Sequence, residues 1–157
     1  MQLALASDHA GLDLKEELAV FLAGLGHTVE NLGTHSRDPV DYPDSARAVA
    51  EALTQGRAER GIVVCGSGAG VSIAANKVPG IRAAVCHDTY SAHQAVEHDD
   101  MNVLCLGARV VGGALAAEIV AAFVNARFSG EGRHRRRLDK LIAIEREFTR
   151  PAAVPQS

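Results

Sequence analysis

The chain has 157 residues, of which 47% are hydrophobic and 22% charged, and its formal net charge at pH 7 is −3. This length and composition predict one globular domain and exclude the disordered and coiled-coil classes. A slightly acidic chain offers no electrostatic attraction for nucleic acid or an anionic membrane, so we expect neither as a partner. The N-terminal segment becomes polar at Ser7, too early for a signal peptide or a membrane-spanning helix. We therefore expect a cytoplasmic protein.

The three cysteines, Cys65, Cys86 and Cys105, include no Cys-x-x-Cys pair. Their spacing does not favour a zinc ribbon or a thioredoxin-like redox site. Thiols in the cytoplasm are normally reduced, and a domain of this size buries enough apolar surface to fold without disulfides. We therefore expect three free thiols.

Apolar segments of strand length alternate with segments of helical periodicity along the chain. In the first helical segment, Leu14, Leu18, Phe21, Leu22 and Leu25 form one apolar stripe. The same criteria apply to the rest of the sequence. They predict strands at 3–6, 28–32, 61–65, 82–86 and 102–106, and helices at about 12–25, 45–53, 69–76, 89–97 and 113–126.

Two helix details complete this prediction. Asp44 or Ser45 is expected to cap the helix that ends near Leu53, because short polar side chains satisfy free N–H groups at a helix start. A last amphipathic helix is expected near the C-terminus. Its apolar side carries Leu138, Leu141, Ile142 and Phe148.

Five short strands, each followed by a helix, predict an α/β protein with a five-stranded parallel sheet covered on both faces. We expect one domain over residues 1–150 and a C-terminal tail over 151–157. Ligands of such sheets bind beyond the carboxyl ends of the strands. Three polar or glycine-rich segments, 7–9, 65–70 and 86–88, follow predicted strands and therefore lie at that edge.

The segment Cys65-Gly66-Ser67-Gly68-Ala69-Gly70 joins a buried strand to a helix. Its alternating glycines allow backbone N–H groups to converge, and the helix start adds positive partial charge, so the loop is typical of an anion site. It is not a nucleotide motif, because Val71 and Ser72 replace the residues that dinucleotide and P-loop motifs require. The alternative is a glycine turn that only permits close strand–helix packing.

Cys65 immediately precedes this loop. Amide groups that bind an anion also stabilise a thiolate, which can act as a base or nucleophile. The alternative is a buried structural cysteine, which is how we interpret Cys86 and Cys105.

Histidine and aspartate recur near the predicted strand ends. Asp8 and His9 could bind sugar hydroxyls and phosphate, or Asp8 could simply cap the following helix. Segments 87–88 and 98–100, together with His93, invite a metal interpretation. However, His93 and His98 are five residues apart, which is poor spacing for two ligands on one helical face. We therefore expect no metal.

Residues 133–137 form a basic cluster, Arg-His-Arg-Arg-Arg. Arg133 and Arg137 are four residues apart, so on a helix they point the same way and could clamp one phosphate. No aromatic platform adjoins the cluster, which disfavours single-stranded nucleic acid. A solvated basic face is the alternative interpretation.

These segments together resemble the type B ribose-5-phosphate isomerase family, which includes galactose-6-phosphate isomerase subunits. The resemblance runs in order over about residues 2–148. It implies a Rossmann-like three-layer sandwich, a homodimer with shared active sites that sometimes forms a tetramer, and no metal, nucleotide or other cofactor. The segments that carry it are 7–11, 41–43, 65–70, 73–77, 80–82, 102–110 and 132–137.

The resemblance also implies a reaction, the reversible conversion of ribose 5-phosphate to ribulose 5-phosphate through an enediol. Family members use a cysteine before the loop or a glutamate after its last glycine as the base. Val71 occupies the second position, which leaves Cys65. Ser67 matches the hydroxyl that moves protons between O1 and O2, and His98 matches the ring-opening histidine. The remaining matched positions are the enediolate-binding amides of Gly66, Gly68 and Gly70, the sugar contacts Asp8 and Tyr42, and the phosphate contacts His9, Arg133 and Arg137, with Arg109 nearby.

One position departs from the family pattern. The family usually has His-Asn where this chain has His98-Asp99. A carboxylate cannot donate a hydrogen bond unless it is protonated, so Asp99 would either oppose the negative intermediate or mark a different sugar substrate. The alternatives are an isomerase of another four- to six-carbon sugar phosphate, a non-catalytic sugar-phosphate-binding subunit, and a metal-dependent hydrolase built on His87, Asp88 and His98.

Overall fold

The structure, a computed structural model, describes residues 1–149. The predicted tail, 151–157, lies outside the described residues. A five-stranded, all-parallel sheet forms the centre of the molecule, with the strand order β2-β1-β3-β5-β4. The strands are β1 (Gln2–Ser7), β2 (Thr28–Asn31), β3 (Arg60–Cys65), β4 (Ala83–Val85) and β5 (Val103–Gly107).

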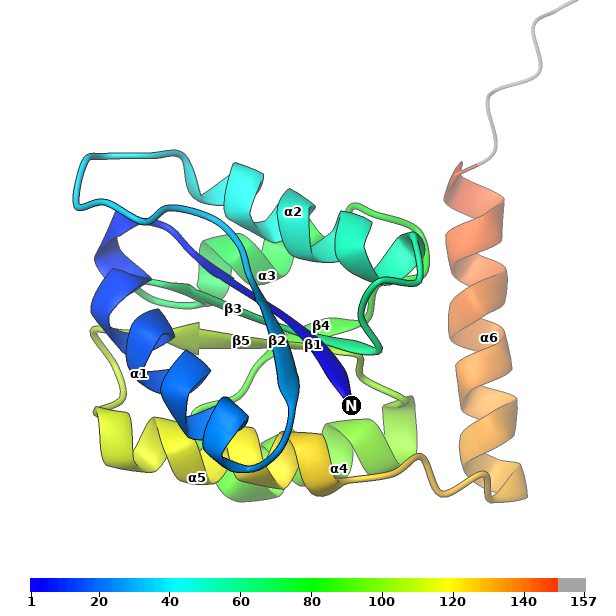
Figure 1. The fold of residues 1–157 in the computed structure, drawn as a ribbon. Coiled ribbons are helices and arrows are strands. Elements are labelled where there is room, and N and C mark those ends of the chain that lie inside the picture. Colours follow the sequence, from blue (N-terminus) through cyan, green and yellow to red (C-terminus); the bar gives the residue numbers. More distant parts are fainter. Residues whose placement is uncertain (150–157) are drawn as a thin grey trace, which may run out of the picture.

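Helices cover both faces of this sheet, as Figure 1 shows. The predicted α/β sandwich is therefore confirmed. Predicted and observed boundaries of the regular elements differ by a few residues at most. The helices are α1 (Leu12–Gly24), α2 (Tyr42–Thr54), α3 (Ala69–Ala75), α4 (Thr89–Asp99), α5 (Gly113–Asn125) and α6 (Gly132–Thr149), and a 3-10 turn (His9–Gly11) precedes α1.

The alternation of side chains along the central strands produces one apolar core on each face. On β1, Leu3 and Leu5 point into the core under α1, α4 and α5, whereas Ala4 and Ala6 point towards α2 and α3. The alanines allow α2 to pack close to the sheet. Because both faces are covered, the strands are apolar throughout, which is why they could be found in the sequence.

The predicted cap of α2 is wrong. The helix begins at Tyr42, and Asp41 occupies the cap position without a side-chain hydrogen bond to the helix. Pro43 fits the first turn because the N–H that proline lacks would have no intrahelical partner there. Ser45 is instead buried, and its Oγ donates a hydrogen bond of 2.7 Å to the carbonyl oxygen of Ser7 at the end of β1.

Lys15 on α1 is completely buried. Its Nζ donates to the carbonyl oxygens of Leu32 and Thr34, at 3.1 and 2.7 Å, and lies 3.2 Å from a carboxylate oxygen of Glu16. These bonds fasten the start of the long connection between β2 and α2 to the first helix. The connection then runs on to Tyr42, one of the predicted site residues.

Helix α6 packs mainly against α4, and its Glu145 also accepts a hydrogen bond of 3.0 Å from the N–H of Gly80. Figure 1 shows this helix beside the sandwich. The apolar side predicted for this helix is only partly covered. Of the predicted residues, Leu138 is buried and Ile142 is half-buried, but Leu141 and Phe148 are 47% and 80% exposed. Ile144, which was not among them, is 56% exposed.

Replacing Lys15 by Met should lower the free energy of unfolding by about 1–3 kcal/mol. Methionine preserves the volume and the apolar stem, but two carbonyl oxygens lose their donor. Urea denaturation provides the measurement. Lys140→Met, on the exposed surface of α6, is the control and should change stability little. Equal effects in the two variants would mean that the bonds of Lys15 do not stabilise the fold.

Candidate active site

The predicted anion loop lies between β3 and α3, with Cys65 as the last residue of the strand. The Cys65 side chain is buried, and its Sγ accepts a hydrogen bond of 3.1 Å from the N–H of Gly68. Ser67 is exposed beside it, and its Oγ accepts a bond of 3.2 Å from the N–H of Ala69. The thiol and hydroxyl are therefore on the same turn, and the amides of that turn point at both.

Close backbone packing against the end of β5 fixes the shape of this loop. Gly68 has a φ of +81°, and a Cβ on Gly107 would lie 2.7 Å from the carbonyl carbon and oxygen of Ser67. The N–H groups of Ala108 and Arg109 donate to the carbonyl oxygens of Cys65 and Gly66, at 2.8 and 3.0 Å. Glycine is required at both positions, so the packing interpretation is correct for these two residues, whereas anion binding by the loop stays a prediction.

Two more predicted residues border the loop. A Cβ on Gly70 would lie 2.9–3.1 Å from the ring of Tyr42, so this aromatic ring covers the start of α3. The side chain of Arg109 approaches Gly66, with its guanidinium nitrogen 3.3 Å from the position of a Cβ there. Tyr42 and Arg109 thus lie at opposite ends of the glycine loop, and Tyr42 remains 43% exposed.

Asp8 and His9 follow β1, the neighbour of β3. The Oδ1 of Asp8 accepts bonds from the N–H groups of Ala10 and Gly11, so Asp8 caps this turn. Its contact with a sugar hydroxyl stays a prediction. His9 Nδ1 accepts a bond of 3.1 Å from the N–H of Val40. A neutral His9 must therefore carry its proton on Nε2, where it is available as a donor to a ligand.

His87, considered as a metal ligand from the sequence, has another role. Its Nε2 accepts a bond of 3.0 Å from the N–H of Gly107, the residue that packs against Ser67. Asp88 caps α4 through the N–H of Ser91, and this hydrogen bond holds the pKa of its carboxyl below the usual value. His87 thus supports the loop from behind, a function that only the three-dimensional packing reveals.

The remaining predicted residues lie at the opposite edge of the sheet. Helix α4 starts beyond the carboxyl end of β4 and runs back towards the start of β5, and its 11 residues span about 16 Å. His98 and Asp99 are at its far end, and Arg133 and Arg137 are on the first turns of α6. One subunit therefore presents two groups of predicted residues at two different edges.

His134 contacts the second group through His98. It was not predicted as a site residue from the sequence. The ring of His98 stacks on the ring of His134, with centroids 4.0 Å apart. His134 is 2% exposed, and its Nδ1 lies 2.6 Å from Ser129 Oγ. The Gln94 amide nitrogen lies 2.9 Å from His98 Nδ1 and directs the proton of a neutral His98 to Nε2. The sequence contained only the adjacency of His134 to the two arginines.

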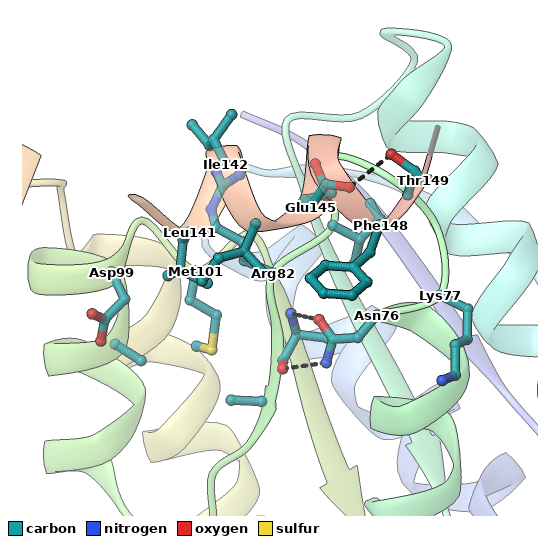
Figure 2. A pocket seen from close by; sticks show the side chains of 15 residues that line it. Asn76, Lys77, Arg82, Asp99, Met101, Leu141, Ile142, Glu145, Phe148 and Thr149 are labelled. Carbon is teal, nitrogen blue, oxygen red and sulfur yellow. Dashed lines mark hydrogen bonds between the residues drawn. The ribbon is translucent and has the colours of Figure 1, made fainter. Parts of the chain in front are cut away.

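The two arginines of this edge differ in their contacts within the subunit. Arg133 Nε donates to Glu131 at 2.9 Å, and Arg137 is exposed. A groove of about 640 Å³ separates α6 from the edge of the sheet at β4, as Figure 2 shows. Asp99 lines it together with Arg82, Met101 and the exposed apolar side chains Leu141 and Phe148.

The metal interpretation of the histidines is not supported by their positions. His87 and His98 are at opposite edges of the sheet. Asp100 is committed to an ion pair of 2.7 Å with Arg82. Within residues 1–149, no group of three or more His, Cys, Asp or Glu side chains is placed to hold a metal ion. No helix in the same range is long and apolar enough to cross a membrane.

The three thiols are free, as predicted. Burial raises the pKa of the Cys86 thiol to about 11 and that of Cys105 to about 12. These two cysteines are therefore protonated core residues at neutral pH. Cys65 is the one whose sulfur accepts a hydrogen bond from the glycine loop.

The fold and this edge define a class: a Rossmann-like α/β protein with a thiol, a hydroxyl and convergent amides at the carboxyl ends of parallel strands. Residues 3–141 match the family model of ribose/galactose isomerases. The chain belongs to this family.

Individual relatives agree with that assignment. The chain is 46% identical to Ribose-5-phosphate isomerase B of Escherichia coli, with 92% of this chain and 96% of that protein covered. It is 45% identical to D-erythrulose-4-phosphate isomerase of Pectobacterium atrosepticum, with 84% and 88% covered. The solved structure of Clostridium thermocellum Ribose-5-Phosphate Isomerase B is 51% identical and superposes with a TM-score of 0.92, covering 95% of this chain and all of that one.

The buried His134 should make stability fall at acidic pH. Burial, and then the positive charges of His98 and Arg133, lower its pKa. At acidic pH the unfolded chain then binds a proton that the folded chain does not. The contribution of neutral His134 to the free energy of unfolding is therefore complete above pH about 6.5 and decreases as the pH falls.

His134→Asn should therefore show a smaller loss of melting temperature between pH 7.5 and pH 5.5 than the wild type. The pKa of His27 is also lowered, chiefly by burial, so part of the loss should remain. His93→Asn, at an exposed position on α4, is the control and should keep the wild-type pH dependence. An unchanged pH dependence in His134→Asn would show that His134 is not held neutral.

Proposed function

We propose that this chain interconverts an aldose phosphate and its 2-ketose phosphate, with ribose 5-phosphate and ribulose 5-phosphate as the preferred pair, in the cytoplasm. The observation that carries the proposal is the Cys65 thiol, which faces the amides of the glycine loop in a member of the ribose/galactose isomerase family. The names of the Escherichia coli and Clostridium thermocellum relatives support the choice of sugar.

The chemistry requires one proton to move between adjacent carbons. With the sugar open, Cys65 as thiolate removes the C2 proton, the electron pair forms the C1–C2 double bond, and the carbonyl oxygen becomes an enediolate. The loop amides stabilise this developing negative charge. Ser67 transfers a proton between O1 and O2, and Cys65 returns its proton to C1 to give the ketose. The substrate is oxidised at C2 and reduced at C1, so no cofactor is needed.

Because the loop amides hold the enediolate, the phosphate at the other end of the substrate must lie away from this loop. His9 Nε2–H and Arg109 are available on the edge that holds Cys65, and Asp8 and Tyr42 are available to the sugar hydroxyls. Ring opening is assigned to His98, and the main phosphate clamp to Arg133 and Arg137. These three residues are at the other edge of the sheet, so they must come from another subunit.

We therefore propose a homodimer in which each active site combines the Cys65 edge of one copy with the His98 edge of the other; further association to a tetramer stays open. The exposed apolar side of α6 supports this assembly, because Leu141, Ile144 and Phe148 are left uncovered within the described part of the subunit. A second copy of this chain would cover them. In the proposed homodimer, His98, Arg133 and Arg137 of each subunit then complete the active site that contains Cys65 of the other subunit.

Cys65→Ala should abolish isomerisation and the incorporation of deuterium from solvent, because no other group replaces the base. Loss of a general base costs about 10²–10⁴ in rate. Proton NMR of ribose 5-phosphate in deuterated water measures both processes. Cys86→Ala removes a buried thiol on the other face of the sheet and should leave the exchange intact. An inactive wild type that still binds sugar phosphates would indicate a non-catalytic binding subunit instead.

Mixing two inactive variants tests the shared site. Cys65→Ala and His98→Asn should each fail with ribose 5-phosphate, but a mixed dimer contains one site with both wild-type residues. After joint refolding of equal amounts, about a quarter of wild-type activity should return, since half of the dimers are mixed and each has one intact site.

The control pair is Cys65→Ala with His9→Ala. These residues lie on the same edge, so no mixed dimer can restore a complete site, and activity should not exceed the sum of the two variants. Absence of recovery in the first pair would place His98 and Cys65 in the same subunit's site.

Asp99 bears on the choice of sugar. If it accepts a hydrogen bond from a sugar hydroxyl, Asp99→Asn should change the ratio of kcat/KM values among four-, five- and six-carbon sugar phosphates by about tenfold, or about 1.4 kcal/mol. The named activity of the Pectobacterium relative makes a four-carbon sugar phosphate the first alternative to include. If the ratio stays constant and ribose 5-phosphate remains best, Asp99 does not determine specificity.

A further inference from the structure

A second pocket opens at the amino edge of the sheet, where β1, β2 and β3 begin. Its volume is about 510 Å³, and it is lined by Met1, His27, Glu59, Arg60 and Arg127. Figure 1 marks the N-terminus at this edge. None of the five lining residues belongs to the proposed active site, and Cys65 is at the opposite end of β3.

Positive charge predominates in this pocket. Arg60 and Arg127 provide two fixed charges, and the amino group of Met1 lies 3.3 Å from His27 Nδ1. Within residues 1–149, Glu59 is the only carboxylate in the lining, and it already accepts a bond of 3.0 Å from the N–H of Gln2. The pocket therefore holds more positive than negative charge at neutral pH.

The two arginines are held firmly in place. Arg60 donates to the carbonyl oxygens of Phe123 and Ala126 at the end of α5, the latter at 2.8 Å, and its guanidinium also lies over the Phe123 ring. Arg127 Nη1 donates to the carbonyl oxygens of Val124 and Ala126, at 3.0 and 2.9 Å. Both side chains thus cap a helix C-terminus.

Helix capping does not use all of the donors. Three guanidinium nitrogens have no hydrogen-bond partner among residues 1–149: Nε and Nη2 of Arg127, and Nε of Arg60. The two guanidinium groups also repel one another, and this repulsion, after burial, lowers the pKa of Arg60. The pKa of His27 is lowered by burial and then by the Met1 amino group and Arg127. An anion in the pocket would relieve each of these repulsions.

We propose that this pocket is a second, non-catalytic site for a small phosphorylated ligand, held by Arg60 and Arg127 with His27 beside it. Preorganised guanidinium groups with free N–H donors suit phosphate oxygens, because the hydrogen bonds are charge-assisted. The volume exceeds that of inorganic phosphate and leaves room for the organic part of a phosphate monoester. The site is independent of the proposed isomerase reaction.

His27 reports occupancy directly. A dianion within a few ångström favours the protonated imidazole, so the pKa of His27 should rise by about one when phosphate binds. The measurement is an NMR pH titration of the His27 ring in phosphate and in chloride at equal ionic strength. Glycerol 3-phosphate, as a second probe, separates the two sources of the phosphate group, since a lower dissociation constant than that of inorganic phosphate identifies an organic ligand.

Variants around the pocket sharpen this experiment. Arg127→Gln should weaken phosphate binding at His27 by about tenfold or more, since one charge-assisted bond is lost. Glu59→Gln should strengthen it several-fold, because the one opposing charge disappears while an acceptor for Gln2 N–H remains. Arg57→Gln is the matched control: Arg57 pairs with Glu30 outside the pocket, and its loss should leave the affinity nearly unchanged.

Phosphate bound at the active site is distinguished by the residue that responds. Arg137→Ala, which removes part of the proposed active-site phosphate clamp, should keep the full response of His27. The proposal is overturned if the His27 titration is the same in phosphate and chloride, or if Arg127→Gln and Arg57→Gln respond alike. If Arg127→Gln fails to fold, Glu59→Gln decides, because an unchanged affinity in that variant contradicts the site.

Discussion

The contact on which the site depends is the direct backbone packing between the loop after β3 and the end of β5. No side chain separates Ser67 from Gly107, and a single Cβ at Gly107 would overlap the peptide group of Ser67. His87 then holds the N–H of Gly107 from the other side. The position of the Cys65 sulfur relative to the amide of Gly68 therefore follows from three strands, β3, β4 and β5, meeting at one edge.

The direction of α4 is the second determinant of the architecture. A parallel sheet requires every crossover helix to return to the amino edge, so a residue at the end of such a helix cannot face the carboxyl edge of the same subunit. His98 is in that position, and its ring is fixed by His134 and Gln94 rather than by anything near Cys65. In the proposed homodimer, each subunit would therefore supply one half-site and complete the half-site of its partner.

Much of the fold could be predicted from the sequence because β1, β3 and β5 are buried on both faces and read as continuous apolar segments. The glycine loop and Cys65 could be identified because their chemistry is local in sequence. The start of α2 could not be placed, because Asp41, Asp44 and Ser45 are equally suitable caps, and packing of Ser45 against Ser7 decided the outcome. His87 and His134 were missed as supporting residues because each acts on a group more than 15 residues away.

The burial of Lys15 also affects the chemical reactivity of its amine. Its ammonium group has no contact with solvent in the folded chain, so acylating reagents and acetyl donors cannot reach it without an opening of α1 against the loop that follows β2. The rate at which Lys15 is labelled, relative to exposed lysines such as Lys140, would therefore follow the opening of this part of the molecule. The labelling rate of Lys15 thus reports local unfolding without an introduced probe.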